Sequence, residues 1–258
     1  MTVPVISITD LYDPPEHPGG ALDLILPYGL PELDLRAVIL DRSTEHRPGA
    51  RDAGVIAMIQ LNAIFGRNVP FARSPSAWMR DPSDSMYDAP PAQQRGIQVL
   101  LHALADSPEP VHLLSFGSAR SVAVAYNRAP EILHEKVARV HLSGTTDPHA
   151  LRRITDAGLP LSRSPAAGCT LPDLKWIEDM HPWLRRYLGY ALGGLSRPDL
   201  LRALEEEAPA EVMADIYQRS YEVRQLAVWM SLAGICIEQA MADVVPALFQ
   251  SFRPSGLS

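Results

Sequence analysis

Short apolar runs alternate with helical patterns along the first half of the chain, and this alternation most constrains the fold. Three runs rich in Val, Ile and Leu occupy residues 3–8, 35–40 and 111–116. Each is bounded by turn-forming or charged residues, as buried parallel strands are. A fourth run, 137–142, alternates with polar residues and fits a strand nearer the edge of the sheet. The sequence therefore predicts an α/β fold with an open, mainly parallel sheet flanked by helices.

Helical spacing of apolar residues predicts helices at 53–65, 93–105, 118–126 and 148–157. The pattern is helical almost throughout from 174 to 247, with prolines as interruptions. We therefore expect one domain over residues 1–258, with a sheet core over 1–170 and a mainly helical part over 171–258. The Pro- and Ser-rich segment 73–91 is long and polar, which predicts a surface excursion or a lid.

Charge and hydropathy exclude several classes of protein. The net charge is −7 and no run of Lys or Arg occurs, whereas nucleic-acid binding needs a basic face. The longest apolar stretches, such as residues 227–237, are shorter than the roughly 20 residues of a membrane-spanning helix. The opening residues lack the basic region of a signal peptide, and two cysteines form no disulfide or metal framework. We therefore expect a cytoplasmic protein that binds neither nucleic acid nor membranes.

Chemistry is expected beyond the carboxyl ends of the strands, where open parallel sheets bind their ligands. The segment after the first strand carries four side chains that exchange protons or bind metals: Asp10, Asp13, Glu16 and His17. Three prolines surround them, and Gly19 and Gly20 follow. Carboxylates clustered at the end of a buried strand indicate either a divalent cation site or an acid/base pair. Helix capping and solvation of a loop are the structural alternative.

Further side chains are candidates for contacts with a small-molecule substrate: Asp41, His46, Arg120, Asp147 and Trp229. His46 follows the second strand, where a solvated loop histidine is the alternative. Arg120 begins a predicted helix and would pair with an anionic substrate, or with Asp41 in a structural salt bridge. Trp229 belongs to the aromatic-rich helical part, in which aromatic side chains otherwise pack helices onto the sheet or onto another subunit.

A series of short motifs follows in a fixed order along the chain. These motifs are Thr9-Asp10 after the first strand, Leu30-Pro31-Glu32-Leu33-Asp34, Arg47-Pro48-Gly49, Gly66-Arg67-Asn68, Gly117-Ser118-Ala119-Arg120, Ala125-Tyr126-Asn127-Arg128 and Asp147-Pro148-His149-Ala150. No single motif is specific, but their order and spacing are. From residue 3 to about residue 235, the chain resembles the inosine/uridine-preferring nucleoside hydrolases, in particular a nucleoside-hydrolase-like branch of them.

This resemblance implies a mostly parallel sheet, a buried Ca²⁺, a dimeric or tetrameric assembly and hydrolysis of a nucleoside N-glycosidic bond. In the family, an aspartate of the opening cluster activates a metal-bound water that attacks the anomeric carbon. The family's aspartate pair falls on Gly19 and Gly20 here, and residues 224–234, which correspond to its last metal ligand, contain no acid. Ca²⁺ takes about six to eight oxygen ligands. We therefore expect no metal and no cofactor.

Three functions follow as hypotheses. The first is an enzyme on this scaffold that acts on a small metabolite without a metal, with the Asp10–His17 cluster as general acid and base. The second is a non-catalytic small-molecule-binding or assembly partner. The third is Ca²⁺-dependent nucleoside hydrolysis with a rebuilt metal site. In each case we expect a homodimer or tetramer, because the aromatic-rich helical half exceeds what a sheet of this size covers.

Overall fold

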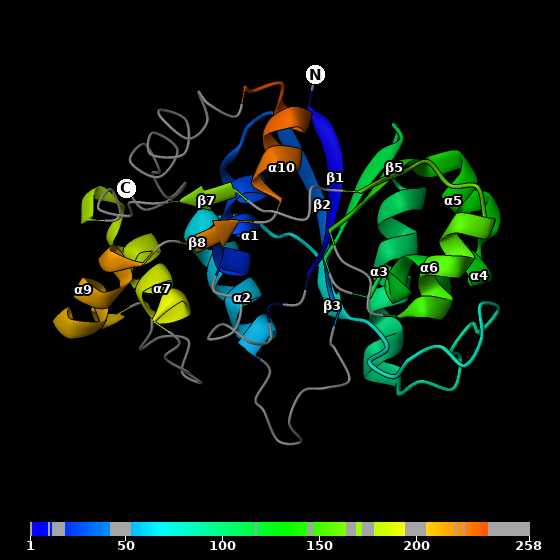
Figure 1. The fold of residues 1–258 in the computed structure, drawn as a ribbon, viewed down its shortest axis with the longest axis horizontal. Coiled ribbons are helices and arrows are strands. Elements are labelled where there is room, and N and C mark those ends of the chain that lie inside the picture. Colours follow the sequence, from blue (N-terminus) through cyan, green and yellow to red (C-terminus); the bar gives the residue numbers. More distant parts are fainter. Residues whose placement is uncertain are drawn as a thin grey trace. The chain divides into compact units, whose positions relative to one another are not determined.

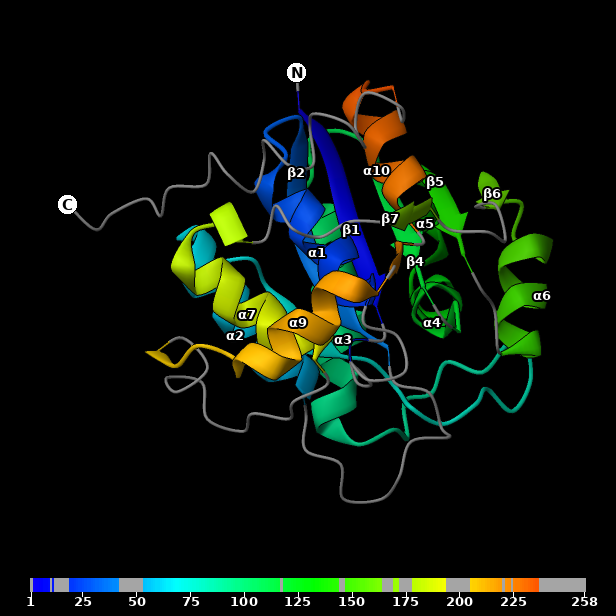
Figure 2. The same cartoon turned by 60° about the vertical axis from the view of Figure 1, so that its left-hand side comes forward.

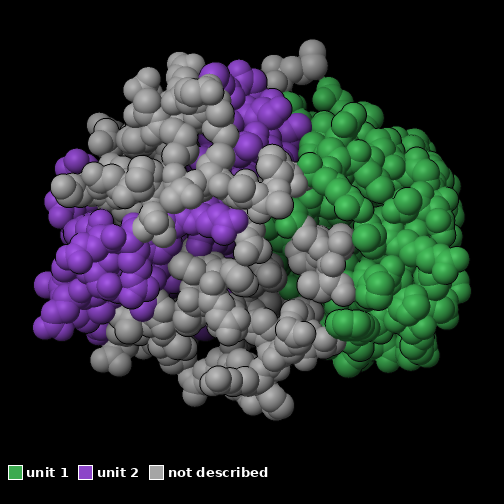
Figure 3. Space-filling view, viewed as in Figure 1, with its two compact units in different colours: residues 1–10, 33–50, 69–166 green, residues 11–32, 51–68, 167–258 purple. Residues whose placement is uncertain are grey.

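A computed structural model describes residues 2–9, 11, 19–41, 53–116, 118–143, 147–163, 169–171, 178–193, 205–219, 221–223 and 225–236. The chain forms two compact units, coloured separately in Figure 3: unit 1 takes residues 1–10, 33–50 and 69–166, and unit 2 takes 11–32, 51–68 and 167–258. The helical second half thus shares its unit with two segments from the first half, a grouping that the sequence pattern did not predict.

Unit 1 is built on a parallel sheet with the strand order β3-β2-β1-β4-β5-β6 (Figure 1). Its strands are β1 Val3–Thr9, β2 Leu33–Leu40, β3 Phe71–Arg73, β4 Val111–Ser115, β5 Val137–Leu142 and β6 Leu161–Arg163. The four apolar runs in the sequence coincide with β1, β2, β4 and β5, so the predicted parallel sheet is confirmed. The edge strands β3 and β6 are too short to produce a period in the sequence.

Four helices pack on one face of this sheet, as Figures 1 and 2 show: α3 Pro91–Ala105, α4 Arg120–Arg128, α5 Pro130–Lys136 and α6 Pro148–Asp156. The core between them joins strand residues such as Ile6 and Leu113 to helix residues such as Leu100 and Val122. Helix α6 begins where it does because the Asp147 side chain accepts hydrogen bonds from the amides of His149 and Ala150. Helices α3, α4 and α6 coincide closely with three of the predicted segments, whereas α5 was not predicted.

Unit 2 is mainly helical. It contains α1 Gly19–Gly29, α2 Ala53–Phe65, α7 Pro182–Leu192, α9 Ala210–Gln218 and α10 Leu226–Ala233, with an antiparallel pair of short strands, β7 Cys169–Leu171 and β8 Tyr221–Val223. Asp23 of α1 accepts a hydrogen bond of 3.0 Å from the amide of Gln225, just before α10. The sequence predicted α2 but not α1, which opens on two glycines and contains Pro27. Within the described part of the chain, every helix is too short or too polar to cross a membrane.

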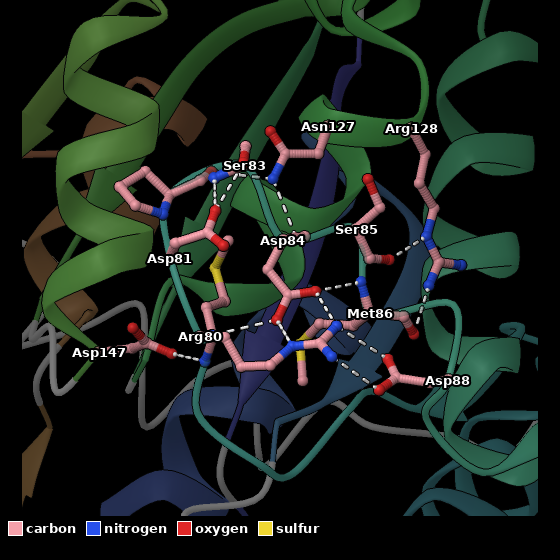
Figure 4. Close-up of polar contacts among 12 residues, drawn as sticks. Arg80, Asp81, Ser83, Asp84, Ser85, Met86, Asp88, Asn127, Arg128 and Asp147 are labelled. Carbon is pink, nitrogen blue, oxygen red and sulfur yellow. Dashed lines mark hydrogen bonds and ion pairs between the residues drawn. The ribbon is translucent and has the colours of Figure 1, made fainter.

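The segment between β3 and α3, predicted to be an excursion or a lid, is tied to the helices of unit 1 (Figure 4). Asn127, near the end of α4, donates to the carbonyls of Pro82 at 2.9 Å and Asp84 at 3.0 Å. Arg128 donates to the carbonyls of Ser85 and Met86. These bonds favour a fixed surface segment over a lid. They also explain the Asn127-Arg128 motif, whose side chains hold a segment about 40 residues away in sequence.

Asp84 is the organising residue within this segment. Its buried carboxylate accepts hydrogen bonds of 2.8 Å from both Nε and Nη2 of Arg80, and it also accepts from the amides of Arg80 and Met86. The bidentate bond from Arg80 holds the pKa of the Asp84 carboxyl well below its usual range. The other carboxylate on Arg80, Asp88, has a side chain that is 68% exposed.

Replacing Asp84 by Asn should lower the melting temperature at pH 7 and do so less at pH 3. The folded-state pKa lies below the unfolded value of 3.8, so the carboxylate contributes stability above about pH 4 and loses it as the pH falls. Hydrogen bonds to a charged group contribute about 1.5–3 kcal/mol. Thermal melts from pH 3 to 7 measure the effect, with Asp88→Asn as the exposed control. A difference that is unchanged between pH 7 and pH 3 contradicts this account.

Candidate functional site

The sheet of unit 1 changes direction between β1 and β4. The chain proceeds from β1 to β2 and β3 on one side, and from β4 to β5 and β6 on the other. In open α/β sheets, ligands bind at such a reversal, outside the carboxyl ends of the strands. Those ends are joined here by a hydrogen bond of 2.8 Å from the amide of Phe116 to the carbonyl of Ile8. The topology therefore places the candidate site beyond Thr9 and Ser115.

The predicted acid/base cluster follows this point in the sequence. Asp10 comes directly after Thr9, the last residue of β1. Asp10, Asp13, Glu16 and His17 lie outside the described residues, as does the substrate-binding candidate His46. Their roles stay predictions. The structure describes the strand ends that precede these residues in the sequence.

Asp41 is a buried carboxylate at this edge, directly after β2. Its Oδ2 accepts hydrogen bonds from the amide of Ser118 at 3.0 Å and from the Ser118 hydroxyl at 2.6 Å. Its Oδ1 accepts from the Ser74 hydroxyl at 3.3 Å. Asp41 thereby joins the ends of β2 and β3 to the turn before α4. The negative charge also stands at the start of α4, where helix amides favour an anion.

Arg120 and Asp147 form a second buried pair in unit 1. Both side chains are 0% exposed, and Nε of Arg120 lies 3.3 Å from Oδ2 of Asp147. Nη1 of Arg120 donates to the carbonyl of Pro75 at 2.7 Å, and the same Oδ2 of Asp147 accepts from the amide of Met79 at 3.0 Å. The sequence indicates Asp41 as the partner of Arg120 in the alternative of a structural salt bridge. In the structure, the salt bridge described for Arg120 is with Asp147. A contact of Arg120, Asp147 or Asp41 with substrate stays a prediction.

Sequence reasoning missed Ser74, because a serine after a strand has no distinctive pattern. It included Ser118 and Ala119 in a motif but did not predict the bond from Ser118 to Asp41 or the backbone of Ala119, which has a φ of 59° and a buried side chain. A left-handed conformation costs a residue with a Cβ about 1–2 kcal/mol, and such strain clusters at functional sites. Ala119 lies in the turn after β4, so this strain supports the same location.

Trp229, the fifth substrate-binding candidate, belongs to unit 2. Its side chain is fully buried in α10, and its indole N–H has no hydrogen-bond partner among the residues that the structure describes. Its contact with a substrate stays a prediction. Its burial also agrees with the alternative that the aromatic side chains serve to pack the helices.

The described start of α1 leaves no room for one carboxylate that the resemblance predicts for a calcium site. A Cβ at Gly19, where the family has an aspartate, would lie 1.9 Å from the carbonyl oxygen of Glu222 in β8. Gly20 is different, because among the described residues a Cβ there would meet only the Leu11 side chain, at 3.6 Å. Within the described part of the chain, no three His, Cys, Asp or Glu side chains come together as a metal site. The first turn of α1 is therefore packed in a way that excludes a carboxylate at Gly19.

Comparison with known proteins places this geometry in a class. No family model matches the chain. A pyrimidine-specific ribonucleoside hydrolase of Citrobacter koseri is 27% identical over 194 residues, which cover 62% of this chain and 59% of that protein. The chain thus spans about three fifths of the length of this curated relative. The sequence similarity supports the resemblance to the nucleoside hydrolases.

Solved structures show the same fold. A plant nucleoside hydrolase superposes with a TM-score of 0.59 at 14% identity, covering 90% of this chain and 79% of that one. The type III effector protein XopQ, solved with adenosine diphosphate ribose, gives 0.61 at 15% identity, covering 97% and 93%. The class is therefore an α/β protein with the nucleoside hydrolase fold. The chain itself is nucleoside-hydrolase-like, in sequence as well as in fold, as its motifs predicted.

Gly19→Asp should destabilise the protein without creating a calcium site, because the new Cβ would meet the Glu222 carbonyl. Overpacking of this kind costs about 1–3 kcal/mol. Gly20→Asp is the matched control and should melt close to the wild type. Metal analysis after dialysis from millimolar Ca²⁺ should find no stoichiometric ion in the wild type or in either variant. A stoichiometric ion in Gly19→Asp would show that the position accepts a metal-binding carboxylate.

Proposed function

We propose that the protein is a nucleoside-hydrolase-like enzyme that acts on a small metabolite by acid/base chemistry, without Ca²⁺, at the carboxyl end of β1. The observation that carries this proposal is the position of β1 at the reversal of the sheet, with Asp10 as the next residue in the sequence. The similarity to ribonucleoside hydrolases suggests an N-glycosidic bond as the bond that is cleaved. The packing of Gly19 supports a mechanism without the family's metal.

The proposed chemistry needs two groups with different protonation states. Asp10, which follows the last residue of β1 in the sequence, takes a proton from water as the water oxygen bonds to the anomeric carbon. A protonated neighbour from Asp13, Glu16 or His17 gives a proton to the leaving nitrogen as the glycosidic bond breaks. Carboxylates that share a site divide acid and base roles in this way. The three prolines around them reduce the entropy lost when the segment is ordered.

The described polar residues support this site by positioning it. Asp41 binds Ser118 and Ser74, and Asp147 binds Arg120 and the Met79 amide, so both carboxylates hold the edge of the sheet. Neither needs a metal to be satisfied in this arrangement. We propose that they fix the strand ends, and their contact with substrate stays a prediction.

Asp10→Asn should reduce turnover by about 10²–10⁴, the usual contribution of a general base, and leave stability nearly unchanged. The substitution keeps the shape of the side chain and removes its charge. A thermal-shift screen of nucleosides, sugars and glycosylated metabolites identifies the substrate, and turnover is then compared between variants. Asp106→Asn, at the exposed end of α3, is the control and should retain full activity.

The same experiment separates the three hypotheses. Unchanged turnover in both Asp10→Asn and Asp13→Asn excludes this segment as the catalytic centre. A ligand that raises the melting temperature without being converted favours a binding protein. Turnover that is lost with a chelator and restored by Ca²⁺ favours the metal-dependent hydrolase.

The assembly that we propose is a homodimer, or a tetramer of dimers, in the cytoplasm, without nucleic-acid or membrane partners. Among the described residues, large apolar side chains are exposed at Ile59, Trp78 and Tyr87, and burial in an interface would remove them from water. Light scattering at micromolar concentration should give at least twice the monomer mass. A monomer mass at that concentration refutes the assembly and leaves the proposed chemistry untouched.

A further inference from the structure

Two histidines and a serine form a hydrogen-bonded chain across β4, β5 and β6. Nδ1 of His112 lies 2.9 Å from Nε2 of His141, and Nδ1 of His141 lies 2.8 Å from the Ser162 hydroxyl. The two imidazole rings are 5.2 Å apart between centroids and inclined by 28°. All three side chains are only half-buried, so small solutes reach them from solvent.

This chain lies on the sheet face opposite to α3–α6. Leu113 and Val140, the sequence neighbours of the two histidines, belong to the core beneath those helices. Because side chains alternate along a strand, His112 and His141 point to the other face. Ser162 stands directly opposite His141 in the register of β5 and β6. This hydrogen-bonded group of two histidines and a serine is therefore separate from the residues assigned above to the candidate site.

We propose that His112 and His141 form a binding site for a divalent transition-metal ion, held by Nδ1 of His112 and Nε2 of His141 and completed by water. No third His, Cys, Asp or Glu joins the pair within the described residues, so the site is a two-imidazole site. Imidazole nitrogens suit Cu²⁺, Ni²⁺ and Zn²⁺, unlike the oxygen ligands that Ca²⁺ requires. The proposal is independent of the proposed function.

The separation of the two nitrogens fits such an ion. Metal–imidazole bonds are about 2.0–2.1 Å long, and two of them at a right angle place their nitrogens about 2.9 Å apart. In the hydrogen-bonded pair the two nitrogens are directed at each other. Binding of the ion would therefore require both rings to turn, so that their lone pairs meet at a point beside the line between the nitrogens. A tetragonal ion such as Cu²⁺ therefore fits the pair better than a tetrahedral one, whose ligand nitrogens lie about 3.3 Å apart.

Proton balance also permits binding. In a neutral pair, one proton lies between the two rings, and it moves to the other nitrogen of its own ring when the metal binds. Ser162 supports this shift, because its hydroxyl oxygen accepts the N–H of Nδ1 once Nε2 of His141 coordinates the ion. Hydrogen bonds of this kind orient metal-binding histidines, and losing one usually lowers metal affinity about 10–100-fold. No net proton is released.

One nearby charge opposes the ion. Arg139 stands opposite His112 in the register of β4 and β5, and its side chain is exposed. Its guanidinium repels a cation at the histidine pair, although solvent and salt screen this repulsion. Removing the charge in Arg139→Gln should therefore raise the affinity for the metal, which a site elsewhere on the protein would not show.

The test is titration of the untagged, full-length protein with Cu²⁺, Ni²⁺ and Zn²⁺ salts, followed by calorimetry and electron paramagnetic resonance. We expect one Cu²⁺ per chain, bound more tightly than Ni²⁺ or Zn²⁺. His112→Gln and His141→Gln should lose this ion, and Ser162→Ala should bind it at least 10-fold more weakly. His102→Gln, an exposed histidine on α3, is the matched control and should bind as the wild type does.

Spectra of the wild type keep the proposal testable even where a variant does not fold. Hyperfine coupling from two imidazole nitrogens on bound Cu²⁺ supports the site. Coupling from one nitrogen or none overturns it, as does unchanged affinity in folded His112→Gln and His141→Gln. Unchanged affinity in Arg139→Gln likewise contradicts the position of the ion.

Discussion

The buried ion pair between Arg120 and Asp147 holds together the parts of unit 1 that surround the candidate site. Both side chains are removed from water, and desolvation of two charges is costly unless each is fully hydrogen-bonded. The structure offsets part of this cost with backbone groups: Pro75 and Met79, on the segment after β3, bond to Arg120 and Asp147, and the Asp147 side chain also caps α6. Removing either partner would leave the other charge buried, at a cost of about 3–5 kcal/mol. The starts of α4 and α6 and the beginning of segment 74–90 therefore depend on one contact.

Gly19 imposes a comparable constraint on unit 2. The first turn of α1 lies so close to the carbonyl of Glu222 that no side chain fits between them. Glycine there is a condition for packing α1 against β8. The resemblance to the nucleoside hydrolases predicts a metal-binding aspartate at the same position, so the expected loss of that carboxylate and the close approach of α1 and β8 concern one residue. A change at Gly20 alone leaves this packing in place.

Sequence patterns predicted most of unit 1, and the reason is local. The strands β1, β2, β4 and β5 can be recognised from the apolar residues within each of them. Asp147-Pro148 is a typical pattern for the start of a helix, and it predicts the start of α6. Helix α1 was missed because two glycines and Pro27 mask its helical propensity. The pairing of Asn127 and Arg128 with segment 74–90, and of Gly19 with Glu222, joins residues far apart in sequence. Such contacts follow from the assembled fold, so no local pattern contains them.

The position of Asp41 determines which part of the carboxyl edge is left for chemistry. The start of a helix offers free amides to an anionic ligand, but the Ser118 amide before α4 already donates to Asp41, and the Arg120 amide donates to the Ser118 hydroxyl. The protein's own carboxylate thus occupies the place that a phosphate takes in other α/β proteins. Arg120 is likewise paired with Asp147. The polar groups described at the start of α4 therefore support the structure of this edge of the sheet. On the β1 side, the carbonyl of Thr9 accepts a hydrogen bond of 2.8 Å from the amide of Asp41, and the next residue in the sequence is Asp10. The catalytic role proposed for the acid/base cluster after β1 therefore concerns residues that directly follow this support.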